Sequence, residues 1–586
     1  MAVEAVATVY SVTGVAFRLA CYILLRVIPS PLALSAIALL FVAHATTVPF
    51  LPANTTTESR PYRAILLSYP SKLRANAIIT GLMLLMVAEF VLTPFFDPAT
   101  ALNFSRVGAV SSSTAKISVR SAEQNQTKQL LYREYRMDNE LSWKTGPLLS
   151  FTEEDDWVST VKLTGLWPNT SYQYALADVN RTVLSGPFSF QTFPDARLST
   201  GSHFRFVASS CITPNFPYVP FHGRTIKGFD ALARYLFPTP DSSPLAEFLL
   251  LLGDFIYSDV PVRIADDKQA YQRLYRRNYQ SSSFRKVYER LPIFHTYDDH
   301  EFRNNFAGAG LDPPPFANAS SAYKIYNANP NFDSPKDQNY YSFTYADVAF
   351  FVLDTRRYRT GGDVESPTML GDTQLAALHA WLSHANSTAS FKFIISSVPF
   401  TSLWGHDAAS DSWAAYPAEK AAVLAALHSV PNVVILSGDR HEFASIEFNA
   451  QHFHTVREYS TSPLNMFDIP FYRTLSKRSA ETVAQAREVV SEDGVKSTED
   501  VEVPKERVVK YLARGNIKWS TFEIDTRNLT QPTLRVDVVI GGKVRYREEL
   551  IGSPVKLQAS NALGAFVTTG LKEAFNRIGI NPSRWF

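Results

Sequence analysis

The sequence predicts an α/β protein in three parts: apolar helices at the N-terminus, a small all-β unit, and a larger domain of sheets layered with helices. Three observations support this. Two long segments within the first 96 residues are almost free of charge, short alternating segments follow to residue 194, and apolar strands alternate with helical stretches over residues 200–450. A chain of 586 residues is also too long for one core, so several domains are expected.

Residues 1–96 are predicted to be a membrane region with two or three transmembrane helices. Residues 27–57 contain no Asp, Glu, Lys or Arg, and residues 75–96 carry one charge, Glu89. Both segments reach the roughly 20 residues that cross a bilayer core. Residues 3–25 are a weaker third candidate because Arg18 interrupts them. We therefore expect an integral membrane protein, with the lipid bilayer as one of its partners.

Basic residues and glycosylation motifs both predict the orientation. The loop between the two strong spans carries Glu58 against four basic residues, Arg60, Arg63, Lys72 and Arg74, and the positive-inside rule places such a loop in the cytoplasm. Residue 97 onward then lies in the lumen or outside the cell. Glycoprotein sequons occur there at Asn103, Asn125, Asn169, Asn180, Asn318, Asn386 and Asn528. Two features oppose this orientation: Asn54 would lie inside, and Arg18 and Arg26 would flank a lumenal turn.

Residues 97–194 are predicted to form a small β-sandwich. Segments such as TAKISVRS and SYQYALADV alternate in polarity, with turns at about ten-residue spacing. The run VKLTGLWPNTSYQYAL resembles the fibronectin type III pattern, in which a Tyr corner ties one strand to the next. Any other all-β accessory domain remains the alternative.

Residues 200–555 are predicted to form the layered domain. Its apolar runs suit strands that are buried on both faces, and helical stretches lie between them at 226–237, 268–291, 372–386 and 418–429. In such domains ligands bind beyond the carboxyl ends of the strands. Residues 475–510 are charged and weakly periodic, which predicts a mobile insertion or a helix, and residues 556–586 are predicted to be a C-terminal tail or helix.

Polar side chains stand where the predicted strands end. They are Cys211, Asp254, Tyr257, Asp298, Asp299, His300, Asp354, Arg356, Asp439 and His441. Each alone has a structural explanation, since Asp commonly caps a helix and a single Cys or Tyr commonly fills a core. Cys211 has no second Cys in the soluble part to pair with. Five strands that end in Asp or Cys, two of them also in His, instead predict a metal site built on loops.

The ordered blocks SSC, LLGDFIY, YDDHEFRNN, LDTRRYR and LSGDRHE resemble the PhoD-like alkaline phosphatases, a family of the calcineurin-like metallophosphoesterase superfamily. The resemblance covers about residues 97–550. It implies a metallophosphoesterase-type β-sandwich flanked by helices, behind a fibronectin-III-like domain. Most of the superfamily ends its first strand in Asp-x-His, whereas this sequence has Cys211 there, as the PhoD-like family does. The membrane region lies outside the resemblance.

The resemblance implies two metal ions that share Asp254. The first is expected to be Fe³⁺, because its other ligands are a thiolate, a phenolate and an imidazole, those of Cys211, Tyr257 and His441. The second is a harder cation, Ca²⁺ before Mn²⁺ or Mg²⁺, because its ligands are oxygens, those of Asp299 and Asp439 with Asn304 or Asn305.

The resemblance also implies the catalytic roles. His300 stands where the superfamily keeps a proton donor for the leaving alkoxide. Asp298 would orient His300. Arg356 would neutralise the non-bridging oxygens of the substrate, with Arg303 and Arg440 as lesser candidates.

Together these expectations describe a membrane-anchored phosphoester hydrolase that uses metal-activated water at a binuclear or multinuclear site. One alternative is a phosphodiesterase that acts on a lipid or glycolipid headgroup. The other is a catalytically dead membrane scaffold or binding protein, against which no predicted ligand position is apolar. A net charge of +2 suggests no nucleic-acid partner, and the sequence leaves the oligomeric state open.

Overall fold

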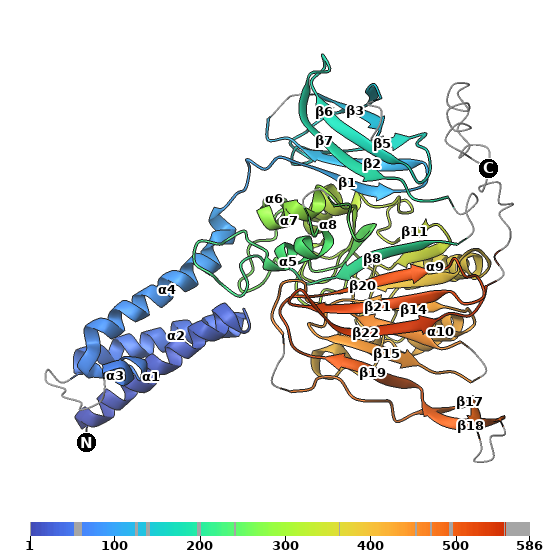
Figure 1. The fold of residues 1–586 in the computed structure, drawn as a ribbon. Helices are drawn as coiled ribbons and strands as arrows, with labels where there is room; N and C mark the ends of the chain where they lie inside the picture. The colour runs from blue at the N-terminus through green and yellow to red at the C-terminus, as the bar shows by residue number, and fades with distance from the viewer. Residues whose placement is uncertain are drawn as a thin grey trace.

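The computed structural model describes residues 2–51, 61–123, 127–135, 141–195, 201–239, 242–361, 364–451, 454–468, 472–490, 496–555 and 557. Along the described chain, a group of helices is followed by a small all-β part and a large layered part (Figure 1). Asn54, Arg60 and Asn125, and all but one residue of the predicted tail 556–586, lie outside the described residues.

Three helical segments near the N-terminus are long and apolar enough to cross a membrane, Glu4–Arg26, Pro31–Phe50 and Pro70–Phe96. They comprise α1 (Ala2–Arg26), α2 (Pro31–Thr47), η1 (Val48–Phe50), η2 (Pro70–Lys72) and α4 (Leu73–Phe96), and the short α3 (Pro61–Leu66) lies between the second and the third. The weaker predicted span is therefore also long and apolar enough to cross a membrane, like the two strong ones. The guanidinium of Arg18 donates to Asn76 Oδ1 at 2.9 Å and to the backbone oxygens of Ile65 and Leu66 in α3, so protein groups satisfy this charge within the helix bundle.

The helices meet the layered part at one end only. The turn between α1 and α2 and the end of α4 lie on the side of the layered part, whereas the N-terminus lies at the far end of the bundle (Figure 1). Two contacts fix the turn: Arg26 Nη1 donates to Tyr218 O at 2.9 Å, and Tyr218 N donates to Leu25 O at 2.9 Å. Residues 27–30 and the chain after α4 therefore share one side of the bundle.

The all-β part contains two sheets. One has the order β1-β2-β5 and the other β4-β3-β6-β7. Their bounds are β1 (Phe104–Val110), β2 (Thr114–Arg120), β3 (Lys128–Glu134), β4 (Lys144–Leu149), β5 (Val158–Thr164), β6 (Ser171–Ala177) and β7 (Val183–Gln191). Before β6, the Trp167 N–H donates to the Tyr172 hydroxyl at 2.8 Å, which is the kind of corner that the predicted motif requires. The fibronectin type III assignment itself stays a prediction.

The layered part is a mixed α/β fold with two large sheets. The first has the order β10-β9-β8-β20-β21-β22, and the second β11-β12-β13-β14-β16-β15-β19. Pairing is parallel from β8 to β10 and among β12, β13, β14 and β16, and it is antiparallel elsewhere. The bounds are β8 (His203–Ser209), β9 (Phe248–Leu252), β10 (Ile293–Thr296), β11 (Tyr341–Tyr345), β12 (Val348–Val352), β13 (Phe391–Ser396), β14 (Val433–Ser437), β15 (Phe443–Phe448), β16 (Val456–Ser460), β19 (Glu506–Leu512), β20 (Lys518–Asp525), β21 (Thr533–Ile540) and β22 (Lys543–Ile551).

The two sheets pack face to face through aromatic side chains. Phe206 of the first sheet meets Phe350 and Phe393 of the second edge-on, with ring centroids 5.4 and 5.3 Å apart. Helices cover the outer faces: α5 (Lys227–Leu236), α6 (Lys268–Tyr279), α7 (Ser282–Tyr288), α8 (Phe316–Tyr323) and η3 (Lys324–Ala328) on the first sheet, and α9 (Gly371–Thr388) and α10 (Pro417–His428) on the second. The predicted helical stretches are found, with residues 268–291 divided between α6 and α7.

The prediction for residues 475–510 is wrong. Over its described residues this segment forms strands: β17 (Thr482–Val490) pairs with β18 (Lys496–Pro504), and β19 adds to the edge of the second sheet beside β15. Pairing with a neighbouring strand outweighs the weak local preference that its charged sequence carries.

Buried charges join the all-β part to the layered part. Asp156, which precedes β5, accepts hydrogen bonds from Arg276 Nη1 at 2.6 Å and from the Tyr326 hydroxyl at 2.5 Å, and it pairs with Arg120 at 3.3 Å. An exposed bridge joins the same two parts. Here the acid belongs to the layered part, and Asp333 pairs with Lys116 and Lys162 of the all-β part at 2.8 Å each.

Asp156→Asn should therefore destabilise the protein strongly, because it leaves two buried guanidinium groups short of a counter-charge. We expect a loss of about 3 kcal/mol or more in the free energy of unfolding. The matched variant Asp333→Asn removes an exposed bridge and should cost less than about 1 kcal/mol. Thermal unfolding of the detergent-solubilised chain measures both, and equal losses would contradict this account of the interface.

The sequons also yield a topology test. The side chains of the six that lie in described residues are exposed, at Asn103, Asn169, Asn180, Asn318, Asn386 and Asn528. If the chain after α4 is lumenal, glycosidase digestion should reduce the mass of the protein expressed in eukaryotic cells. Replacing these six Asn by Gln should abolish most of that shift. Modification at Asn54 with none at the six would reverse the orientation.

Candidate metal centre

The candidate site lies where parallel strands of both sheets end. Ser210 and Cys211 follow β8, the Gly253–Asp254 pair follows β9, and Tyr297 to His300 follow β10. From the second sheet, Ser397 Oγ donates to Asp298 Oδ1 at 2.7 Å, and Ser397 O accepts from the N–H of Gly438, which follows β14, at 3.1 Å. The carboxyl ends of the two sheets therefore meet at one edge, as the sequence predicts.

Two glycines allow the strand ends to approach so closely. A Cβ at Gly253 would lie 2.6 Å from Cβ of Asp298, and the φ of Gly253 is +99°. A Cβ at Gly438 would lie 2.7 Å from Leu252 O, across the boundary between the sheets. A side chain at Gly253 or Gly438 would clash with a neighbouring strand end, which explains why each motif has Gly before its Asp. Both Asp side chains are directed into the same space.

Three predicted ligands have left-handed backbone conformations. The φ angles are 61° at Cys211, 54° at Asp254 and 62° at Asp439. Such conformations cost about 1 kcal/mol or more for non-glycine residues and gather at functional sites. Here the neighbouring backbone hydrogen-bonds the loops together, with Cys211 N to Gly253 O at 3.3 Å and Ile212 N to Asp254 O at 2.8 Å.

The residues predicted to bind iron surround one oxygen of Asp254. The Tyr257 hydroxyl lies 3.1 Å from Asp254 Oδ2, and Cys211 Sγ lies 3.4 Å from the same atom. His441 Nε2 is 3.4 Å from the Tyr257 hydroxyl. Cys211, predicted from the sequence as a ligand rather than as core filler, therefore lies among the other predicted iron ligands.

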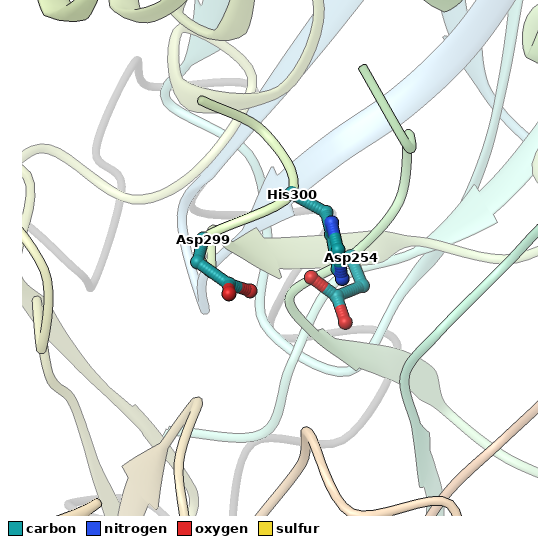
Figure 2. Close-up of side chains that lie close together, drawn as sticks. All are labelled: Asp254, Asp299 and His300. Carbon is teal, nitrogen blue, oxygen red and sulfur yellow. The ribbon is translucent and has the colours of Figure 1, made fainter. Parts of the chain in front are cut away.

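Asp254 also faces the predicted second site. Asp254, Asp299 and His300 each offer a ligand atom, and these atoms lie within 4.8 Å of one another (Figure 2). His300 is therefore placed where it could bind a cation as well as donate a proton. Asp439, Asn304 and Asn305 line the same cleft, which has a volume of about 380 Å³.

The charge state of these side chains fits a cation. Asp254 Oδ1 and Asp299 Oδ1 are buried and lack a hydrogen-bond partner within the described part of the chain. Burial raises the pKa of Asp254 well above its ordinary value, and the Asp299 and Asp298 carboxylates raise it further against the opposing effect of His300. Burial likewise raises the pKa of the Cys211 thiol, and Asp254 adds to this. A cluster of acids that repel one another in this way is a suitable donor set for positive ions.

The structure changes the predicted roles around His300. The prediction that Asp298 orients His300 is wrong, because the partner of His300 Nδ1 is Asp259 Oδ1 at 2.7 Å. Asp298 Oδ1 instead accepts from Arg356 Nε at 2.5 Å. Asp259 comes from the loop after β9. It lies outside the motifs LLGDFIY and YDDHEFRNN, so the sequence did not indicate its role.

Arg356 also differs from its predicted role as a group that binds substrate. Its side chain is 0% exposed, and its two terminal nitrogens bond the carboxylate of Asp411 at 2.8 and 3.0 Å. Of the three predicted arginines, Arg440 lines the cleft, while Arg303 is exposed outside it. Arg440 Nη1 pairs with the exposed Asp407 of η4 (His406–Ala409) at 2.9 Å.

Glu301 is a further residue that sequence reasoning left without a role. Its carboxylate accepts the backbone N–H groups of Asp254, Phe255 and Asp298, at 3.0, 2.6 and 2.8 Å. It therefore fixes the loop after β9 against the loop after β10. The sequence offered one signal for Glu301, its position beside His300 in YDDHE. It offered no comparable motif around Asp411.

Comparison with known proteins supports a phosphatase relationship. Residues 238–508 match the family model of the PhoD-like phosphatases, a match that begins after Cys211. The chain is also 29% identical over 241 residues to alkaline phosphatase D of Bacillus subtilis (strain 168), and that match covers 32% of this chain and 40% of the relative. The chain thus matches less than half of that relative's length.

Two solved phosphatase structures share the fold. The structure of PhoD aligns with a TM-score of 0.52 at 17% identity, over 78% of this chain and 89% of that one. The purple acid phosphatase PPD1 of yellow lupin (Lupinus luteus) aligns with a TM-score of 0.51 at 11% identity, over 76% of this chain and 74% of that one. At these identities the likeness concerns the fold.

The donor set predicts how metal content responds to substitution. Asp254→Asn should weaken metal binding at least about tenfold, because the shared carboxylate loses its charge. Cys211→Ser should lower iron more than the second cation, since Ser does not ionise near neutral pH. Elemental analysis of the purified chain measures both effects.

Asp347→Asn is the matched control for these variants. Asp347 is equally buried, but it bonds the hydroxyls of Ser202 and Ser390 away from the site. Metal content that stays normal in Asp254→Asn, or that falls equally in Asp347→Asn, would argue against this centre.

Proposed function

We propose that the protein is a metal-dependent phosphoester hydrolase of the PhoD-like type, held in a membrane by its N-terminal helices. Residues 200–555 would be the catalytic domain, on the lumenal or extracellular side, and residues 97–194 a fibronectin-III-like accessory domain. The observation that carries the proposal is the buried group of acids, thiol, phenol and imidazole at the edge of a phosphatase-type fold. The match of residues 238–508 to the PhoD-like phosphatases supports it.

The proposed ligands divide by chemistry. Cys211, Tyr257 and His441 would hold Fe³⁺ with Asp254, and Asp254, Asp299 and Asp439 would hold Ca²⁺, Mn²⁺ or Mg²⁺, with Asn304 or Asn305 at the rim. When bound, such cations supply the positive charge that activates water and stabilises the phosphoryl oxygens. Burial lowers the pKa of His441 well below its ordinary value, so its imidazole is neutral, as a metal ligand must be.

His300 is proposed as the proton donor to the leaving alkoxide. Burial alone would lower the pKa of its ring, but the carboxylates of Asp299, Asp259 and Asp254 outweigh this and raise the pKa well above its ordinary value. The ring therefore carries a proton that it can donate. Asp259 holds Nδ1, and the ring lies against Tyr257 with centroids 4.2 Å apart, so its orientation is fixed.

Arg440 replaces Arg356 in the proposed binding of the phosphoryl oxygens. It lines the cleft next to Asp439 and His441, and its partner Asp407 is exposed and can be displaced. Arg356 is proposed to be structural, because it is fully buried and neutralises Asp298 and Asp411. Its loss would leave the buried Asp298 carboxylate without its counter-charge, whereas Asp411 would keep its pair with Arg359.

The role of His300 can be tested by the choice of leaving group. His300→Ala should lower turnover roughly 10²–10⁴-fold for alkyl phosphoesters, which need a proton on the departing oxygen. The loss should be much smaller for p-nitrophenyl esters, whose leaving group departs as an anion. Equal losses on both substrates would indicate a ligand or structural role for His300.

Asp259→Asn provides a coupled test. The variant should also affect alkyl esters more than p-nitrophenyl esters, but by less than His300→Ala, because the imidazole remains. In the double variant the loss should be no greater than in His300→Ala alone, since Asp259 acts through His300. Additive losses would mean that Asp259 acts independently.

A further inference from the structure

One wall of the catalytic cleft comes from the predicted membrane region. Ile28, Pro29, Ser30 and Pro31, the turn between α1 and α2, line the same cleft as Asp254, Asp299 and His300. These residues precede the first predicted ligand, Cys211, by at least 180 positions in the sequence. The likeness to PhoD-like phosphatases in residues 238–508 does not include them. The turn is therefore a feature that needs its own explanation.

The turn is held rigidly beside the site. Tyr218, seven residues after Cys211, accepts from Arg26 through its backbone and donates its hydroxyl to Glu89 of α4 at 2.6 Å. Its ring packs among buried residues of α1, α2 and α4, including Leu25, Ile37 and Phe90. The cleft and the helix bundle therefore form one packed structure.

An apolar side chain connects the bundle to the metal centre. Phe467 packs against the buried cluster of the helices and also against the cluster that contains Cys211 and Tyr257. Its ring meets the ring of His441 edge-on, with centroids 4.3 Å apart. One side of the cleft is therefore apolar and continuous with the helices, while the other side carries the carboxylates.

Exposed apolar side chains lie beside the turn and on the loop that is bonded to α4. Phe221 is 93% exposed, and its N–H donates to Glu89 Oε1 at 2.8 Å, within the span Pro70–Phe96. Leu32, directly after the turn, is also exposed. Large apolar side chains at this level are stabilised by lipid contact.

We propose that the phosphoester which this cleft hydrolyses is the headgroup of a membrane lipid. The inference rests on the proposed function and names its substrate class. The lipid would keep its acyl chains in the bilayer beside α1 and α2, and its headgroup would pass along the turn Ile28–Pro31 to the carboxylates. Water adds to phosphorus and loses one proton to the solvent, and the bond between phosphorus and the departing oxygen breaks. His300 gives its proton to that oxygen, which leaves as an alcohol, and the ring is reprotonated from the solvent.

A soluble phosphoester has the same reacting group, so the experiment must separate the two sources. The full-length chain in nanodiscs is given phosphatidic acid or phosphatidylglycerol in phosphatidylcholine bilayers. The soluble arm uses the dibutanoyl forms of the same two lipids and p-nitrophenyl phosphate. We expect the long-chain lipids to be turned over at least about tenfold faster than their dibutanoyl forms at equal bulk concentration.

Substitutions in the turn test the route of entry. Ile28→Gln and Pro31→Gln should lower turnover of the long-chain lipids about tenfold and lower p-nitrophenyl phosphate turnover by a clearly smaller factor. Pro31 is at the first position of α2, where Gln is tolerated, so this variant keeps the helix. Leu184→Gln, an exposed apolar position on β7, is the control and should alter neither activity.

Each outcome decides between the two proposals. Turnover of p-nitrophenyl phosphate without turnover of either long-chain lipid would overturn the lipid inference and leave the hydrolase proposal standing. Equal losses on lipid and soluble substrates in the turn variants would mean that the turn only supports the fold, which also overturns it. If the metal-loaded protein hydrolyses no phosphoester, the proposed function itself fails.

Discussion

Mutual repulsion of buried acids is the constraint around which this domain is arranged. Asp254, Asp298, Asp299 and Asp439 lie at adjoining strand ends. The first three are almost entirely withdrawn from water, and Asp439 is partly buried. Isolated charges in such surroundings are strongly unfavourable, so each must meet a donor, a counter-charge or a cation. This requirement accounts for the polar contacts of the site.

Protein groups meet the requirement for some of these acids and not for others. Arg356 neutralises Asp298 from below and is itself shared with Asp411. Asp254 and Asp299, nearer the cleft, each keep one oxygen without a hydrogen-bond donor among the described residues. Asp298 Oδ2 also lacks a donor among the described residues, so Arg356 balances the charge of Asp298 without completing its hydrogen bonds. Asp254 and Asp299 line the cleft, and their carboxylates are suited to metal ions.

The sequence predicted the members of this site better than their partners. Continuous apolar runs that end in Cys, Asp or His are local signals, and parallel pairing brings such ends together, so Cys211, Asp254 and Asp439 were found in advance. Partner choice depends on loop paths that no local pattern records. Asp259 reaches His300 across 41 positions, and Asp298, although adjacent in sequence to Asp299, points to Arg356. The strands of residues 482–512 were missed for a similar reason, since pairing decides their conformation.

The junction after α4 determines how far the layered part can move relative to the helices. Asp97, the first residue beyond the helix, pairs with Arg224 and Arg277 of the layered part, and β1 begins at Phe104. With Glu89 bonded to the loop at Tyr218 and Phe221, the helix continues into the domain without a flexible tether. In the proposed membrane-anchored hydrolase, a catalytic domain mounted in this way cannot swing outward to a neighbouring membrane. Its proposed working area is the patch of bilayer around its helices, and it would meet membrane-bound substrates by lateral diffusion within that plane.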